Sequence, residues 1–285
     1  MLLPRLLRGA AETEENEMTI SYCIPCHKRT EDLLESLPSL LAAADADGAP
    51  GIEVVLVDYG NPVPLAKELW KFFGQDRISF FRRTVTLGSV MYEDLVTGIL
   101  SNSDEYQSSS VHTRTSVVCV EYRARDYYHM GHARNVALRV ATGDYVTIGQ
   151  TDVHWRPHAF VSIGLRLESE PEIDCLRSMT DGYIGVITCR REQLLAVGGY
   201  DERFEFYGSE DKDLLSRINR LKLHIATYDL DDLLVLKRTP KHQKVLNYRL
   251  PLTLAEMSQR SKSVMRDNDA AGRIVVNEGI EWGKL

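Results

Sequence analysis

Asp152 and His154 have residue types and a spacing that could bind a metal ion. They follow the apolar run Tyr145 to Ile148 in the stretch Gly143 to His154. In an extended chain, two residues with a single residue between them point to the same side. A carboxylate and an imidazole placed in this way can hold one divalent cation. The imidazole suits Mn²⁺ better than Mg²⁺. On this segment alone, a strand followed by an ordinary polar turn is an equal alternative.

Glu210 and Asp211 form a second pair of residues whose types could take part in catalysis. Apolar residues at helical spacing follow them, and Gly208-Ser209 before them lets the chain turn sharply. A carboxylate held at such a place can act as general base on a hydroxyl group. Acidic residues at a helix start are also common as simple caps that interact with the helix dipole. The two residues alone do not decide between these roles.

The elements that must position these residues begin at Thr19. Ile20 to Pro25 and Ile52 to Val57 are apolar runs of strand length, and a helical pattern lies between them. We predict Thr30 as the N-cap of that helix and a kink at Pro38. A strand, a helix and a strand at this spacing predict a right-handed unit with parallel strands, and therefore an α/β fold with a mostly parallel central sheet flanked by helices.

Further along, the pattern is less regular. A serine-rich stretch, 101–110, lies within residues 84–115 and indicates an inserted surface excursion. The remaining predicted elements are helices at Leu65 to Phe73, from Gly131 and at Leu252 to Val264, and strands at Ile78 to Phe81 and Val117 to Tyr122.

Two charged residues come where the first two strands end. Asp58 follows the second strand and Arg29 follows the first, so both should lie close together on the rim that carries Asp152. Open α/β sheets bind ligands at the carboxyl ends of their strands, which makes both residues candidate ligand contacts. Side chains that are only solvated are an equal alternative.

Composition excludes several classes of protein. The net charge of −7 over 285 residues gives no basic footprint, so a nucleic-acid partner is not expected. Five scattered cysteines favour a reducing compartment over a disulfide framework, and we expect a cytoplasmic protein. Cys23 and Cys26 should face opposite sides of a strand, as buried thiols and not as zinc ligands.

The ends of the chain carry weaker signals. No apolar run approaches the ~20 residues that span a bilayer, although the segment Met1 to Arg8 leaves a peripheral membrane contact open. Residues 1–18 read as a disordered leader, 19–250 as one α/β domain, and 251–285 as a helix and tail that pack on it.

Several motifs occur in the order seen in glycosyltransferases similar to family 2, which have the GT-A fold. A later segment resembles the carboxyl-terminal part of galactosyltransferases and chondroitin-synthase-type enzymes. The resemblance extends over most of the chain from Thr19 to about Asn247. The motifs are Ile24-Pro-Cys-His-Lys-Arg29, Val54-Val-Leu-Val-Asp-Tyr-Gly-Asn61, Gly131-His-Ala-Arg-Asn135, Ala141-Thr-Gly-Asp-Tyr-Val146, and Gly198-Gly-Tyr-Asp-Glu-Arg-Phe204 followed by Tyr207-Gly-Ser-Glu-Asp-Lys-Asp-Leu214.

This resemblance implies a nucleotide-diphospho-sugar transferase fold and a metal-dependent transfer from a nucleotide sugar, expected to be a UDP-sugar, to an acceptor hydroxyl. Asp211 matches the catalytic base and Glu210 an acceptor-binding carboxylate. Tyr207 and Trp155 could stack on sugar faces, although aromatic side chains are more often core. The implied donor-binding residues are Pro25, His27, Arg29, Asp58, Arg134 and Asp152, and the implied Mn²⁺ or Mg²⁺ ligands are Asp152, His154 and His242.

Two departures from the family pattern keep alternatives open. Asp58-Tyr-Gly-Asn stands where an Asp-Asp-Gly-Ser-like turn is usual, and Asp152-x-His154 stands where Asp-x-Asp is usual. The second resembles retaining N-acetylgalactosaminyltransferases, so retention is an alternative to inversion. A solvated surface residue is the alternative for His242. A sugar nucleotidyltransferase is another alternative, but it would need a glycine-rich phosphate loop after the first strand, and Ile24 to Arg29 contains no glycine. A catalytically degenerate sugar-binding domain is the non-enzymatic alternative.

Overall fold

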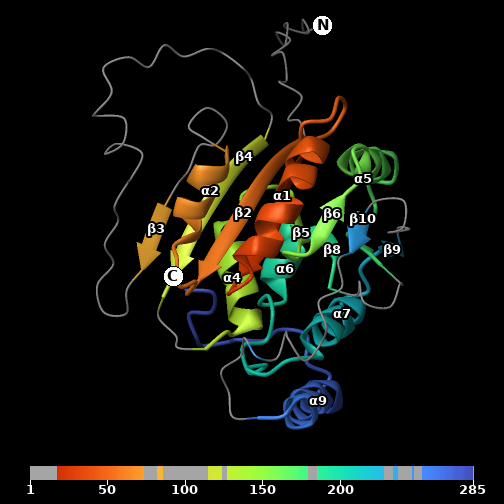
Figure 1. The fold of residues 1–285 in the computed structure, drawn as a ribbon. Helices are drawn as coiled ribbons and strands as arrows, with labels where there is room; N and C mark the ends of the chain where they lie inside the picture. The colour runs from red at the N-terminus through yellow and green to blue at the C-terminus, as the bar shows by residue number, and fades with distance from the viewer. Residues whose placement is uncertain are drawn as a thin grey trace, which may run out of the picture.

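A computed structural model shows a twisted sheet covered by helices on both faces (Figure 1). It describes residues 18–73, 82–85, 115–123, 127–178, 185–227, 234–236, 246 and 252–284. Most of the predicted leader, the strand predicted at Ile78 to Phe81, most of the excursion predicted at 84–115, and His242 lie outside these residues.

Within the described residues, eight strands form one sheet in the order β3-β4-β2-β1-β5-β8-β7-β9. The half from β3 to β5 is parallel, whereas β8 runs antiparallel to both β5 and β7. This confirms the predicted α/β class and the mostly parallel sheet. The strands are β1 (Thr19–Cys26), β2 (Gly51–Tyr59), β3 (Arg82–Val85), β4 (Thr115–Tyr122), β5 (Tyr145–Ile148), β7 (Cys175–Arg177), β8 (Ile187–Arg190) and β9 (Ile225–Thr227).

The helices cover the two apolar faces of this sheet. One buried cluster includes α1 and α5 residues, and the other includes α4 and α7 residues. Cys26 belongs to the first cluster and Cys23 to the second, so the two thiols are buried on opposite faces of β1 as predicted. The helices are α1 (Thr30–Ala44), α2 (Leu65–Phe73), α4 (Met130–Val140), α5 (Ala159–Ser169), α6 (Arg191–Ala196), α7 (Glu210–Arg220) and α9 (Leu254–Ala270).

The start of α1 differs from the prediction. Arg29 occupies the N-cap position, and Thr30 is the first helical residue. The Arg29 side chain makes no capping hydrogen bond and binds two carboxylates instead. Pro38 lies inside α1, and the helix continues through it without a break.

The cysteines also differ from the prediction. Cys175 of β7 and Cys189 of β8 are opposite each other in the antiparallel pair and form a disulfide. Disulfides persist mainly in oxidising compartments, so this bond runs counter to the reducing, cytoplasmic environment that the cysteine count favoured. The bond links β7 to β8 inside the sheet.

Two further elements frame that site. Strand β6 (Val153–Trp155) pairs with β10 (Leu234–Leu236) in a separate antiparallel ribbon, and Asp152 lies in the turn that leads into β6. Helix α9 packs beside α7, and the chain after α9 returns to α4, where Arg139 stacks on Trp282 (Figure 1). No helix among the described segments is long and apolar enough to cross a membrane.

The close contact between β1 and the turn before β5 predicts a sharp effect of one glycine. A Cβ at Gly143 would lie 2.7 Å from the backbone nitrogen of Ser21, which cannot move without disturbing β1. We expect Gly143→Ala to lower the free energy of unfolding by about 1–3 kcal/mol. Urea denaturation of the purified variant measures this.

Gly131→Ala is the matched control, because its added Cβ would meet neighbours only at ordinary contact distances of 3.6 Å and beyond. Gly131 lies inside α4, where alanine has the higher helix propensity. Equal stability of the two variants would contradict the proposed close packing at Gly143.

Candidate active site

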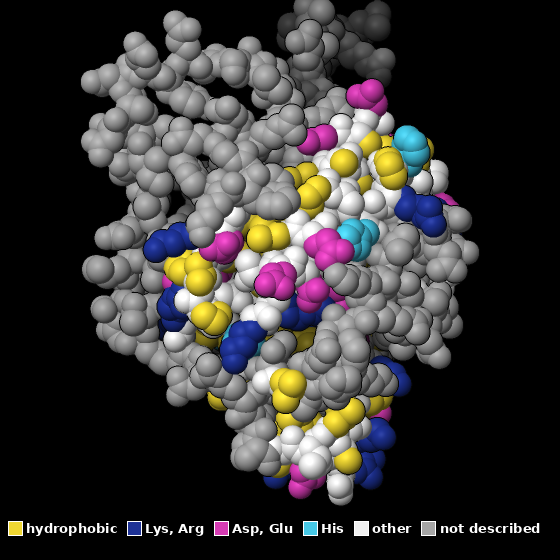
Figure 2. Space-filling view, viewed as in Figure 1, with side chains coloured by type: hydrophobic (Ala, Val, Ile, Leu, Met, Phe, Trp, Pro, Cys, Tyr) yellow, Lys and Arg dark blue, Asp and Glu magenta, His cyan; other side chains and the backbone are white. Residues whose placement is uncertain are grey.

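Buried and half-buried charges meet between the sheet and the start of α7. Arg134 comes from α4, and Glu210 and Asp211 open α7, so side chains from separate parts of the chain share one small volume. In the space-filling view, acidic side chains and a histidine gather near the middle of the face, around a hollow with basic side chains at its back (Figure 2). Glu210 and Asp211, which meet Arg134 here, are the two carboxylates that the sequence analysis singled out as catalytic and acceptor-binding.

Asp211 is held through one oxygen and remains partly exposed. Its Oδ1 accepts from Arg134 Nη1 at 2.6 Å and from the Tyr200 hydroxyl at 3.2 Å. A Cβ placed on Gly185 would lie 2.8 Å from its Oδ2 and 3.1 Å from Gln150 Nε2, so the absence of a side chain on Gly185 allows its backbone to approach this carboxylate closely. The Asp211 side chain is one-fifth exposed. The carboxylate is therefore fixed in orientation and still reached by solvent.

Glu210 lies deeper than Asp211. Its Oε1 is 3.6 Å from Arg134 Nη1, and its buried Oε2 has no hydrogen-bond partner among the described residues. Burial and the charge of Asp211 raise the pKa of Glu210 to about 7, although Arg134 opposes this shift. The carboxyl group can therefore exchange a proton near neutral pH and has a free oxygen for a polar ligand.

The sharp turn before α7 follows from two unusual backbone conformations. Gly208 has a φ of 101° and Ser209, the N-cap, has a φ of 71°. Left-handed conformations suit glycine, whereas they are uncommon for serine. The prediction that Gly208-Ser209 turns the chain into a helix opened by Glu210 and Asp211 is confirmed.

Tyrosines connect the two predicted halves of the site. Burial raises the pKa of Tyr207, and the charges of Glu210, Asp211 and Asp152 add to that rise. Burial also raises the pKa of Tyr128, and the charges of Arg134, Arg29 and Glu210 act on the same hydroxyl. The Asp152 side and the α7 side are therefore within electrostatic reach of the same aromatic residues.

Arg29 and Asp152 form a pair that the sequence did not predict. Arg29 Nη2 lies 2.9 Å from Asp152 Oδ2, and Arg29 Nε lies 2.9 Å from Asp32 Oδ2. We predicted Arg29 beside Asp58, but Asp58 Oδ1 accepts from Asn61 and Asp58 Oδ2 from the Leu65 backbone at 2.7 Å. Asp58 is 1% exposed and organises its own loop at the start of α2.

The predicted metal ligands fit a divalent cation by their chemistry. Asp152 offers carboxylate oxygens, and His154, on β6 and half-buried, offers an imidazole nitrogen. Hard and borderline cations such as Mg²⁺ and Mn²⁺ accept this donor set. Within the described ranges, no group of three or more His, Cys, Asp or Glu side chains is placed to hold a metal.

The other predicted residues are placed differently. His27 is buried, stacks on Tyr128 with ring centroids 5.1 Å apart, and bonds the Tyr59 carbonyl oxygen through Nδ1. Pro25 lies inside β1, paired in register with β2. Trp155 is 4% exposed and packs on Tyr22 and Phe160. Stacking of Trp155 on a sugar therefore has no support from its position, because the ring lies in the core.

Two functional candidates were missing from the sequence prediction. Tyr200 binds the base candidate Asp211 directly, and Gly185 borders it. Tyr200 lies within the Gly198 to Phe204 motif, so its neighbourhood was noticed while its role was not. Nothing in the sequence around Gly185 indicates its contact with α7.

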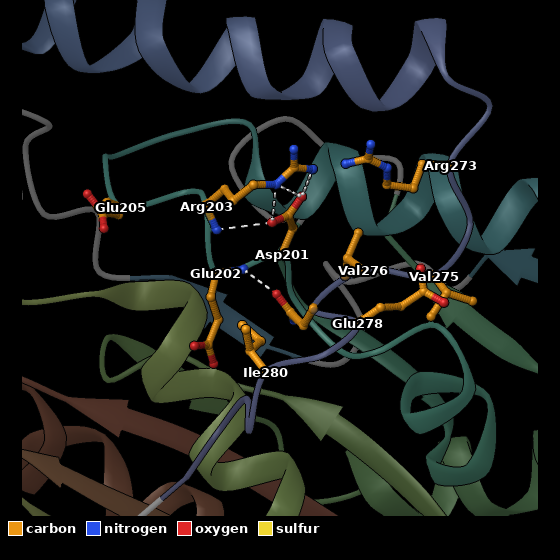
Figure 3. Close-up of a pocket in the computed structure, with 10 residues that line it drawn as sticks. Asp201, Glu202, Arg203, Glu205, Arg273, Val275, Val276, Glu278 and Ile280 are labelled. Carbon is orange, nitrogen blue, oxygen red and sulfur yellow. Dashed lines mark hydrogen bonds and ion pairs between the residues drawn. The ribbon is translucent and has the colours of Figure 1, made fainter.

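A pocket of about 490 Å³ lies between the Asp201 turn and the C-terminal chain. Figure 3 shows Asp201 and Arg203 paired at its wall, with Val275, Val276 and Glu278 of the C-terminal chain facing them. The Asp201 carboxylate is saturated by Arg203 and Asn268, so this pocket is a gap between the turn and the C-terminal chain.

Comparison with known proteins identifies the fold. Residues 174–242 match the family model described as the N-terminal domain of galactosyltransferase. No curated protein matches the chain. Residues 1–349 of S. aureus TarS in complex with UDP superpose with a TM-score of 0.54 and 14% identity, over 89% of this chain and 72% of that one.

Two further structures give the same result. The mannosyltransferase PcManGT from Pyrobaculum calidifontis, in complex with GDP-Man and Mn²⁺, has a TM-score of 0.52 and 15% identity over 89% of this chain and 75% of its own. The catalytic domain of Drosophila β1,4-galactosyltransferase 7, in complex with xylobiose, has a TM-score of 0.50 and 14% identity over 87% and 79%. The chain has the GT-A glycosyltransferase fold. The predicted resemblance is therefore confirmed.

The raised pKa of Glu210 predicts a pH-dependent effect on stability. A carboxyl group whose pKa rises from 4.5 to about 7 on folding favours the folded state while protonated. Its contribution is fully present below pH 4.5 and is lost as the pH rises to about 7. We expect Glu210→Gln to raise the free energy of unfolding at pH 8 by up to roughly 3 kcal/mol, and to change it little at pH 4.5.

Urea denaturation of both proteins at pH 4.5, 6 and 8 measures this difference. Glu205→Gln, at an exposed carboxylate in the same segment, is the control and should show no such pH dependence. A Glu210→Gln difference that stays constant across the three pH values would contradict a raised pKa.

Proposed function

We propose that this protein transfers a sugar from a nucleotide-sugar donor, a UDP-sugar, to an acceptor hydroxyl with inversion at the anomeric carbon. One observation carries the proposal. Asp211 is fixed by Arg134 and Tyr200 through one oxygen, and its side chain is still one-fifth exposed. A general base needs this combination of fixed orientation and an accessible lone pair.

The reaction that this geometry supports is a direct displacement. The acceptor oxygen attacks the anomeric carbon and forms the new glycosidic bond while its proton passes to Asp211. The bond between the anomeric carbon and the diphosphate oxygen breaks, and the nucleoside diphosphate leaves with that electron pair. Arg134 keeps Asp211 aligned throughout, because its guanidinium group is buried and bound to the oxygen that faces away from Gly185.

The donor side of the site is proposed from position and from comparison. Arg29, Asp152 and His27 lie at or just after the carboxyl end of β1 and next to β6, where open α/β sheets bind their ligands. TarS is in complex with UDP, and PcManGT is in complex with GDP-Man and Mn²⁺. These complexes support a nucleotide-sugar donor for this chain.

We assign Asp152 and His154 as protein ligands of Mn²⁺ or Mg²⁺, with His242 as the proposed third. A divalent cation bound to a diphosphate stabilises the negative charge of the leaving group. Arg29 holds the Asp152 carboxylate through one oxygen and thereby limits the orientations it can take. The sequence analysis left open a catalytically degenerate sugar-binding domain, and the two experiments below test that alternative.

The acceptor side is assigned to Glu210 and Tyr207. Glu210 carries an oxygen without a hydrogen-bond partner in the described part of the chain, and it lies beside the proposed base. Such an oxygen can accept a hydrogen bond from a second acceptor hydroxyl and thereby orient the first. Tyr207 is partly exposed in the same loop and offers an aromatic face.

Replacement of the base gives the first test. Asp211→Asn keeps the shape of the side chain, but the amide cannot accept the acceptor proton. General-base catalysis contributes about 10²- to 10⁴-fold, so we expect kcat to fall by that factor. Transfer from a panel of UDP-sugars to oligosaccharide acceptors, with product stereochemistry by NMR, measures it.

Asp213→Asn is not a useful control, because Asp213 is buried against Arg217. Lys212→Gln changes an exposed neighbour in the same helix turn and should leave transfer unchanged. A folded Asp211→Asn protein with the wild-type rate would overturn the assignment of the base. Retention of anomeric configuration would favour the retaining alternative.

Replacement of a proposed metal ligand gives the second test. Mutation of residues that only hydrogen-bond to a metal's ligands lowers metal affinity by about 10- to 100-fold. Asp152→Asn changes a proposed ligand itself, so it should weaken Mn²⁺-dependent UDP binding at least as much. Calorimetry of UDP binding with Mn²⁺ and with EDTA measures the dependence.

Asp32→Asn is the matched control, since Asp32 is the other carboxylate on Arg29. If Asp152 acted only by holding Arg29, both variants would weaken UDP binding alike. Unchanged UDP affinity in Asp152→Asn with Mn²⁺ present would contradict its role as a ligand.

A further inference from the structure

The chain after α9 forms a strap, defined here as residues 273–283, that crosses the Gly198–Glu202 turn. Its backbone approaches that turn very closely. The Val276 nitrogen donates to the Val197 carbonyl oxygen, and a Cβ at Gly198 would collide with the backbone of Val276. At its end, a Cβ at Gly283 would lie 2.7 Å from the Asn135 carbonyl oxygen. The strap is therefore seated directly on the turn and on α4.

Asn277 makes the polar contacts at the centre of the strap. Its Nδ2 donates to the carbonyl oxygens of Gly198 at 2.8 Å and Tyr200 at 2.7 Å. Its Oδ1 accepts from the Glu202 backbone nitrogen at 3.0 Å. Asn277 has a φ of 60°, a left-handed conformation that asparagine tolerates better than most residues. One side chain thus binds three backbone groups of one turn.

Asn135 of α4 holds the same turn from the other side. Its Nδ2 donates to the Tyr200 carbonyl oxygen at 2.8 Å, and its Oδ1 accepts from the Tyr200 backbone nitrogen at 2.8 Å. Asn135 thus binds both backbone polar groups of Tyr200, and Asn277 of the strap adds a second donor to the carbonyl oxygen. The position of the Tyr200 backbone depends on both.

Tyr200 passes this constraint to the reactive carboxylate. Its hydroxyl donates to Asp211 Oδ1 at 3.2 Å, and the Arg134 guanidinium lies 4.8 Å above its ring. Burial raises the pKa of Tyr200 well above its usual value, so the hydroxyl keeps its proton at working pH and donates throughout. A shift of the turn would move the hydroxyl that binds Asp211 and the ring against which the Arg134 guanidinium packs.

We infer that Asn277 is a positioning residue for Asp211 and acts through the backbone of Tyr200. This inference rests on the proposed role of Asp211 as the base. The strap supplies one of the three hydrogen bonds by which side-chain amides clamp the Tyr200 backbone, so residues of the strap help to set the geometry of a carboxylate at the start of α7. Arg29 and Asp152, beside which the donor is proposed to bind, are not members of this clamp.

Asn277→Gly tests the inference, because glycine keeps the left-handed backbone and removes only the amide. Small misplacements of a catalytic group cost up to about 100-fold in rate, so we expect kcat to fall about 10- to 100-fold with little change in donor KM. Glu278→Gln, at the exposed neighbour on the strap, is the control and should keep the wild-type kcat.

A double-variant comparison separates positioning from general destabilisation. Tyr200→Phe removes the hydroxyl that binds Asp211, so adding Asn277→Gly to it should lower kcat by much less than Asn277→Gly does alone. Full additivity, or a wild-type kcat in Asn277→Gly, would overturn the inference. The rates are measured well below the melting temperature of each variant, and Asn277→Asp replaces Asn277→Gly if the latter does not fold.

Hydrogen exchange gives a readout that does not require activity. In Asn277→Gly, the backbone amide of Glu202 loses its acceptor and the carbonyl oxygens of Gly198 and Tyr200 each lose a donor, so exchange of the peptide around residues 198–203 should accelerate while exchange of α1 is unchanged. Unchanged exchange there would contradict the clamp itself. If wild-type protein transfers no sugar but exchange accelerates as expected, the proposed function fails while the clamp stands.

Discussion

The buried guanidinium of Arg134 is the constraint on which the site depends. The side chain is 4% exposed, and a cation taken out of water needs closely placed opposite charges. Asp211 at 2.6 Å and Glu210 at 3.6 Å supply them. Because Arg134 belongs to α4 and both carboxylates to the first turn of α7, this requirement fixes where α7 begins relative to the sheet.

A second buried network supports α7 from its other side. Arg217 is fully buried, binds Asp213 at 2.8 Å, and donates to the carbonyl oxygens of Val197 and Gly199. Asn268 of α9 then bridges Asp213 and Asp201. Each removal of one partner would leave a buried charge or polar group unsatisfied, so α7, α9 and the turn before Tyr200 are held in one arrangement.

The sheet could be predicted because its strands are short apolar runs whose character is local. The runs at Ile20 to Pro25 and Ile52 to Val57 correspond to β1 and β2. Pairings set by tertiary structure could not be predicted. Arg29 pairs with Asp152, and Cys175 meets Cys189 across two strands. For Trp155 the sequence left sugar stacking and a core position open, because an aromatic residue after a polar turn fits either, and the structure places it in the core.

The same distinction separates the parts of the site that could and could not be predicted. Glu210 and Asp211 have charged side chains next to a glycine turn, so their types and spacing are visible in the sequence. Asn277 binds backbone groups of the turn that carries Tyr200, and every residue has such groups, so no spacing in the sequence marks the contact. A site that depends on backbone position can therefore be complete in its reactive side chains at the level of sequence, while the elements that align them appear only in three dimensions. For this chain, the alignment of a carboxylate early in α7 extends to the strap near the end of the described residues.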